Sequence, residues 1–141
     1  MITTIEDLHE HLQWAIELEH ATIPPYLCAL YSIKDGSNIE SVEVIQSVFI
    51  EEMLHMALVA NIMIATGGSP KLDYPEFIAK YPTPLPHSDE SFQVDLNKFS
   101  PESIECFLKI ERPANADAPS QDEGFASIGQ FYKALEEGLV Y

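Results

Sequence analysis

The segment Glu51-Glu52-Met53-Leu54-His55-Met56 places two carboxylates and an imidazole inside a run, residues 42–65, that is otherwise almost wholly apolar. Burying an ionised carboxylate without a partner is costly, so something must compensate for it. Residues three apart lie on one face of an α-helix, and Glu-x-x-His is a spacing by which helical bundles hold a metal ion between helices. The segment therefore predicts a helix with Glu52 and His55 as metal ligands. Glu51 lies toward the flank of the apolar stripe and is a reserve ligand.

The first helix, predicted to run from its N-cap Thr4 to about Ile33, supplies a second carboxylate for such a site. At about 100° per residue, Glu19 interrupts the apolar stripe of this helix on the same face. Glu17 lies about 200° away by the same periodicity and is predicted to be solvated. The stripe itself consists of Leu8, Leu12, Ala15, Ile23, Tyr26 and Leu30. If the two helices form an antiparallel hairpin with a short turn, Glu19 and Glu52 lie at the same level along it. Glu19 is therefore the third predicted ligand.

The chain is expected to form a single domain, residues 1–141, in three consecutive parts. Residues 1–68 are a helical hairpin, ended by Gly67-Gly68-Ser69-Pro70, because glycine suits a helix end and proline prevents continuation. Residues 69–124 are an insertion with eight of the ten prolines, carrying a short helix near residues 101–111. Residues 125–141 are the third bundle helix. The insertion is interpreted either as a lid or wall beside a pocket, or as a structural cover for the core.

Composition restricts the partners of the chain. Its 141 residues, 46% of them hydrophobic, fit one globular domain with a sizeable core. A formal net charge of −16 disfavours nucleic acid and anionic membrane surfaces as partners. Charged and polar side chains interrupt the apolar run of the second helix, so no membrane span is predicted. There is no signal peptide at the start, and Cys28 and Cys106 have no metal or redox spacing, so we expect a cytoplasmic protein.

Five phrases of the chain resemble the ferritin-like domain of iminophenyl-pyruvate dimer synthases, enzymes of violacein and rebeccamycin biosynthesis. They are residues 15–27, AIELEHATIPPYL; 51–56, EEMLHM; 81–86, YPTPLP; 110–113, IERP; and 127–132, SIGQFY. The resemblance implies an all-α, ferritin-like helical bundle. It also implies iron held by Glu from one helix and Glu-x-x-His from the next, and a small aromatic or amino-acid-derived substrate.

Two features depart from the pattern that this resemblance implies. The position that matches a ligand carboxylate in the third helix holds Gln130, a poor ligand for a hard cation, so one metal is expected rather than two. The fourth bundle helix, with its carboxylate and histidine, is not found before the sequence ends. The chain is therefore interpreted either as a fragment or as one completed by another chain, most simply in a homodimer. The second helix is apolar nearly all round, so it is predicted to be central or to cover a subunit interface.

Three classes of function stay open at this point. The first is an iron-dependent oxidative or coupling enzyme of secondary metabolism, with Mn or Zn as other metals that carboxylate and imidazole ligands can bind. The second is an iron-binding protein without a substrate. The third is a metal-free interaction module, in which Glu52 and His55 form a buried hydrogen-bonded pair. His20, next to Glu19, is a further reserve near the site, although a core histidine fits its position equally well.

Overall fold

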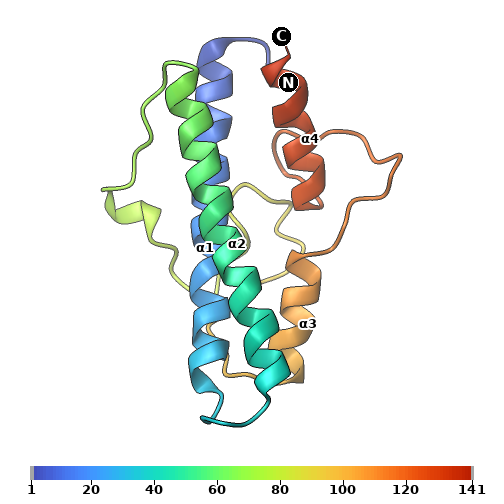
Figure 1. Ribbon diagram of the computed structural model, residues 1–141. Coiled ribbons are helices and arrows are strands. Elements are labelled where there is room, and N and C mark those ends of the chain that lie inside the picture. Colours follow the sequence, from blue (N-terminus) through green and yellow to red (C-terminus); the bar gives the residue numbers. More distant parts are fainter. Residues whose placement is uncertain (1, 141) are drawn as a thin grey trace.

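The computed structural model describes residues 2–140, and this part of the chain is all-helical without a β-strand (Figure 1). The predicted fold class is confirmed. Its elements, in chain order, are α1 (Ile5–Ser32), α2 (Ile39–Ala65), the short 3-10 helix η1 (Pro75–Phe77), α3 (Pro101–Ile110) and α4 (Ile128–Leu139).

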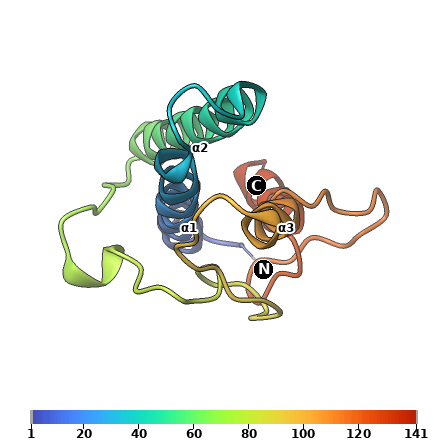
Figure 2. The ribbon, with the colours of Figure 1, turned by 90° about the horizontal axis from the view of Figure 1, so that it is seen from below.

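Helices α1 and α2 form an antiparallel hairpin that lies side by side in both views (Figures 1 and 2). At the start of α1, the Thr4 side chain accepts a hydrogen bond from the backbone of Asp7, and the Asp7 carboxylate accepts one from the backbone of Thr4. This reciprocal cap satisfies two donors that a helix N-terminus otherwise leaves unpaired. Pro24 and Pro25 lie inside α1 without ending it.

Two short helices, α3 and α4, occupy the third position of the bundle. Figure 1 shows them one below the other along the same side of α1, and they overlap when the hairpin is viewed along its length in Figure 2. The short helix of the insertion is thus more than a cover for the core. It fills the lower part of a position that the sequence assigned to residues 125–141 alone. The junction between α3 and α4 lies beside the middle of the hairpin.

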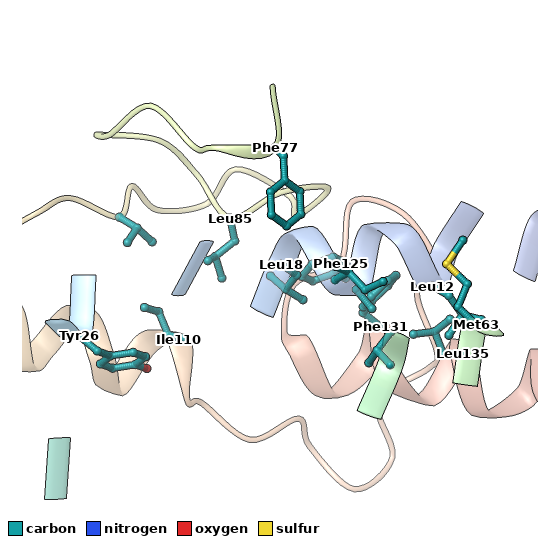
Figure 3. Packing of buried hydrophobic residues seen from close by; sticks show 14 of the residues in the cluster. Leu12, Leu18, Tyr26, Met63, Phe77, Leu85, Ile110, Phe125, Phe131 and Leu135 are labelled. Carbon is teal, nitrogen blue, oxygen red and sulfur yellow. The ribbon is translucent and has the colours of Figure 1, made fainter. Parts of the chain in front are cut away.

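The hydrophobic core surrounds α1. Figure 3 shows α1 side chains packed against Phe131 and Leu135 from α4, with Phe125 stacked on Phe131 at 4.9 Å between ring centroids. The insertion closes another side of α1 with Leu85 and Phe77, both buried. The central helix of the described chain is therefore α1, whereas the sequence predicted that α2 is either central or covers a subunit interface, and the second possibility stays a prediction.

The outer helix α2 keeps an exposed apolar face. Only Ile45, Glu52, Val59 and Met63 of α2 are buried. Large side chains that stay exposed on this helix are Ile39, Val44, Ile50, Met53, Leu54, Leu58, Ile62 and Ile64. By length and composition alone α2 is also apolar enough to cross a membrane, with a mean hydropathy of 1.6. Because ionisable side chains at mid-span are expensive in lipid, Glu51, Glu52 and His55 near its middle argue for a bundle helix instead.

Candidate metal centre

The structure brings together the three residues that the sequence predicts as metal ligands. Nδ1 of His55 lies 3.5 Å from Oε2 of Glu19 and 3.6 Å from Oε1 of Glu52. The three donor atoms all lie within 4.8 Å of one another. These separations are too long for hydrogen bonds, so the pair of Glu52 and His55 is not hydrogen-bonded in this arrangement. Donors that bind one metal at about 2.0–2.2 Å lie roughly 3–3.5 Å apart, which is close to the two separations between Nδ1 of His55 and the carboxylate oxygens.

Each carboxylate of the group has one oxygen held by a hydroxyl and the other turned to His55. Tyr132, from α4, donates a hydrogen bond to Oε1 of Glu19, and this leaves Oε2 facing the imidazole. The Thr22 hydroxyl, from α1, lies 2.5 Å from Oε2 of Glu52, which leaves Oε1 facing the imidazole. Such supporting hydrogen bonds orient carboxylate ligands in metal sites.

Burial makes the charges of this group expensive in the metal-free protein. Glu19 and Glu52 are only 3% and 6% exposed, whereas the His55 side chain is 48% exposed. Burial raises the pKa of Glu19 to about 8 against the hydrogen bond from Tyr132, and the negative charges of Glu52 and Glu111 add to the rise. Burial also raises the pKa of Glu52. A divalent cation would hold both carboxylates ionised, so the donor set fits a metal.

The group opens into a cavity of about 220 Å³ at the junction of α3 and α4. Its other lining residues are Ile110, Glu111, Arg112, Pro113, Ile128, Gly129 and Tyr132. A second, apolar groove of about 300 Å³ adjoins it, lined by Leu58, Val59 and Ile62 together with His55 and Tyr132. Because His55 and Tyr132 line both spaces, a small apolar molecule in the groove would lie next to the candidate metal ligands.

None of the three reserve residues joins the group. Glu51 is exposed on α2. Gln130 is turned away from the site, since its amide bonds to the Ser127 hydroxyl and to the carbonyl of Pro119. His20 packs on Phe77 of the insertion, with ring centroids 4.4 Å apart. The sequence pattern identified Gln130 as the position that matches a ligand carboxylate. It could not predict which face of α4 is turned toward α1. In the structure this face carries Tyr132, which contacts Glu19.

Glu17 corrects a prediction, because it is half-buried and not solvated. Its carboxylate accepts hydrogen bonds from the Tyr74 hydroxyl at 2.5 Å and from Nε2 of His87 at 3.0 Å. Although burial opposes it, these hydrogen bonds lower the pKa of Glu17. The periodicity of α1 places Glu17 correctly on the face opposite the metal ligands. The error arises because the insertion covers that face, which no local pattern reveals.

Comparison with known proteins agrees with this architecture. A family model described as Ferritin-like matches residues 12–140. The chain belongs to the ferritin-like family. A solved structure of a ferritin-like protein from Caulobacter vibrioides is 33% identical to it, with a TM-score of 0.82. The alignment covers 99% of this chain and 53% of that one, so this ferritin-like chain spans about half the length of its solved relative. No curated protein matches the chain.

These matches support the ferritin-like assignment and do not extend to the iminophenyl-pyruvate dimer synthases. They agree with a bundle that offers Glu19 from α1, and Glu52 and His55 from α2, as a candidate metal centre. Thr22 and Tyr132 are the residues of the candidate site that the sequence pattern missed. Thr22 stands one turn after Glu19, on the same face, and this spacing was the available signal. Tyr132 was assigned only to the apolar stripe of its helix.

Proposed function

We propose that this ferritin-like protein is an iron enzyme that oxidises or couples a small aromatic or amino-acid-derived molecule. Glu19, Glu52 and His55 would hold the metal, and the groove along α2 would hold the substrate. The observation that carries the proposal is the orientation of the two buried carboxylates, each with one oxygen held by a hydroxyl and the other facing Nδ1 of His55. The cytoplasm and secondary metabolism are the setting that we propose for this activity.

The donor set supports iron as the first choice of metal. Two carboxylates and one imidazole suit Fe and Mn, and they also bind Zn. Iron, when bound, would supply the one-electron chemistry that the side chains of this site lack. Tyr132 and Thr22 would keep the carboxylates in position. The half-exposed ring of His55, which lines the apolar groove, supports a substrate role over iron binding alone.

Metal analysis of matched variants tests this proposal. Protein prepared without chelator should contain iron, and Glu52→Gln should lower the affinity for Fe²⁺ by at least about tenfold, a loss of the kind seen when a metal site is disturbed. Glu51→Gln is the control, because it makes the same chemical change at the exposed neighbouring position. Equal affinities of both variants and the wild-type protein would contradict the metal site. If the protein binds metal but shows no saturable binding of aromatic amino acids or aryl 2-oxo acids, it is an iron-binding protein without a substrate. The proposal that it is an enzyme would then fail.

Association with another chain is a second candidate function. It is supported by the exposed apolar face of α2, which carries Leu54, Leu58 and Ile62 at successive helical turns. A second copy of this chain is the simplest partner, and it would cover the side of the hairpin on which the apolar groove opens. The oligomeric state of the protein tests this function.

A further inference from the structure

We propose that a cavity between α1 and the insertion is a second ligand site, which binds a small organic amine. The cavity has a volume of about 660 Å³. Because Glu17 lines it, the cavity lies on the face of α1 opposite the candidate metal ligands. It shares no lining residue with the metal centre or with the apolar groove of α2. The proposal therefore does not depend on the proposed iron enzyme and adds a binding function to it.

Three parts of the chain build this cavity. Its lining consists of Glu17 and Ala21 from α1, residues 76–80 and 83–88 with Glu90 from the insertion, and Glu123 and Gly124 from the loop before α4. Phe77 and Leu85 are buried and anchor the two insertion walls in the core (Figure 3). The rings of Pro84 and Pro86 fix the backbone φ angle in one wall. Since sites for small organic molecules have volumes of about 300–1,000 Å³ and walls formed in advance, the cavity suits such a ligand.

The fold fixes the ring of His87 at this cavity from two sides. Its Nε2 lies 3.0 Å from Oε2 of Glu17, and the Trp14 ring stacks on it at 4.2 Å between centroids with an interplanar angle of 11°. When neutral His87 donates from Nε2 to Glu17, its Nδ1 is a hydrogen-bond acceptor. Within residues 2–140, Nδ1 has no hydrogen-bond partner, and the side chain is 29% exposed. His87 therefore offers an oriented acceptor to a ligand.

The charges of the lining favour a cation. Four carboxylates, those of Glu17, Glu76, Glu90 and Glu123, line the cavity, and Lys80 contributes one ammonium group. Although burial opposes it, hydrogen bonds lower the pKa of Glu17, so this carboxylate is held ionised. In the described part of the chain the other three carboxylates form no ion pair. A concave surface with an excess of one charge attracts ligands of the opposite charge and repels carboxylates and phosphates.

The apolar part of the lining separates an organic amine from an inorganic cation. Ile78, Ala79, Pro84 and Pro86 give the cavity apolar walls, which an alkyl chain can contact. An ammonium group only donates hydrogen bonds, and this cavity offers it the acceptors that it needs. A metal ion would leave the walls unused. Among the described residues, moreover, the carboxylates of this cavity do not come close enough together to form a metal-binding group.

Calorimetric titration of the chelator-treated full chain with 1-hexylamine tests the proposal. Hexylamine should bind saturably, and 1-hexanol and hexanoate, which have the same chain length, should bind at least about tenfold more weakly, because they lack the positive charge. Chelator removes metal from the protein, so the result is independent of the metal centre.

Two pairs of variants locate the binding. Ala79→Phe fills the cavity and should weaken hexylamine binding by at least about tenfold, whereas Ala116→Phe, at an exposed position outside the cavity, should not. The double variant Glu90→Gln/Glu123→Gln removes two exposed charges of the lining and should weaken binding several-fold. Glu43→Gln, an exposed change on α2, is its control and should leave the affinity unchanged.

The outcomes decide the proposal in either direction. Absence of saturable hexylamine binding would overturn it, and so would equal affinities for hexylamine and hexanol. Hexylamine binding that is unchanged in Ala79→Phe would show that the amine binds elsewhere. Should Ala79→Phe not fold, the double glutamine variant decides, because both of its positions are exposed, and an unchanged affinity there would also overturn the proposal. Loss of iron binding in Glu52→Gln, in contrast, tests only the metal centre.

Discussion

At the scale of single residues, Glu52 separates metal binding from simple pairing with His55. In the metal-free protein Glu52→Gln removes a buried charge near Glu19, so we expect the free energy of unfolding to stay the same or to rise. If Glu52 were instead the charged partner of His55, the same change would cost about 1–3 kcal/mol. Chemical denaturation of chelator-treated proteins measures the sign, with Glu51→Gln as the exposed control. A clearly less stable Glu52→Gln variant together with a metal-free wild-type protein would rule out the metal site.

Glu19 makes the stability of the metal-free protein depend on pH. Its pKa is about 8 in the folded chain and 4.5 as the ordinary value, so the folded state holds the extra proton between these values. Stability is then fully present below about pH 4.5 and is lost as the pH rises through 8. We expect thermal unfolding of chelator-treated protein to move to lower temperature over this window, and the trend to flatten in Glu19→Gln.

Glu10→Gln, an exposed change on the same helix, should keep the full trend. Saturating metal should also reduce it, because a bound cation holds the carboxylate ionised at every pH in the window. A wild-type protein whose melting temperature is constant from pH 5 to 8 without metal would show that Glu19 is not held protonated.

At the scale of elements, Glu17 fastens the insertion to the hairpin. Glu17→Ala removes the acceptor for Tyr74 and His87, and we expect a loss of about 1–3 kcal/mol. Hydrogen exchange should become faster in residues 74–88, while metal affinity stays unchanged because Glu17 lies on the other face of α1. Glu10→Ala is the control on an exposed part of the same helix. Unaltered exchange in residues 74–88 would mean that other contacts hold the insertion.

How much the sequence predicts differs between helices and contacts. Periodicity, caps and breakers are local, so the helices and the convergence of Glu19, Glu52 and His55 follow from α1 and α2 alone. The supporting bonds are not local: Tyr132 and Glu19 are 113 residues apart, and His87 and Glu17 are 70 apart. Such pairings depend on how α3 and α4 share one bundle position, which a helical pattern does not encode. For this reason the hydroxyl partners were missed and Glu17 was misplaced.

At the scale of the whole molecule, the apolar face of α2 and the net charge of −16 oppose each other in association. Apolar burial favours contact between two copies, whereas two strongly acidic surfaces repel. Because salt screens the repulsion and leaves apolar burial intact, we expect a dimer that becomes tighter at higher ionic strength. An interface dominated by ion pairs would weaken under the same conditions, so the direction of the salt effect identifies the surface.

Light scattering over a range of protein and salt concentrations measures this association. Leu58→Glu adds a charge beside the groove and should give a monomer at all salt concentrations. Val44→Glu, at an exposed apolar position near the start of the same helix, is the matched control and should weaken the dimer less. Because Leu58 lines the groove but is not a metal ligand, Leu58→Glu should still bind metal, which distinguishes a lost interface from a lost fold. A wild-type protein that stays monomeric as salt rises would show that a second copy of this chain does not cover α2.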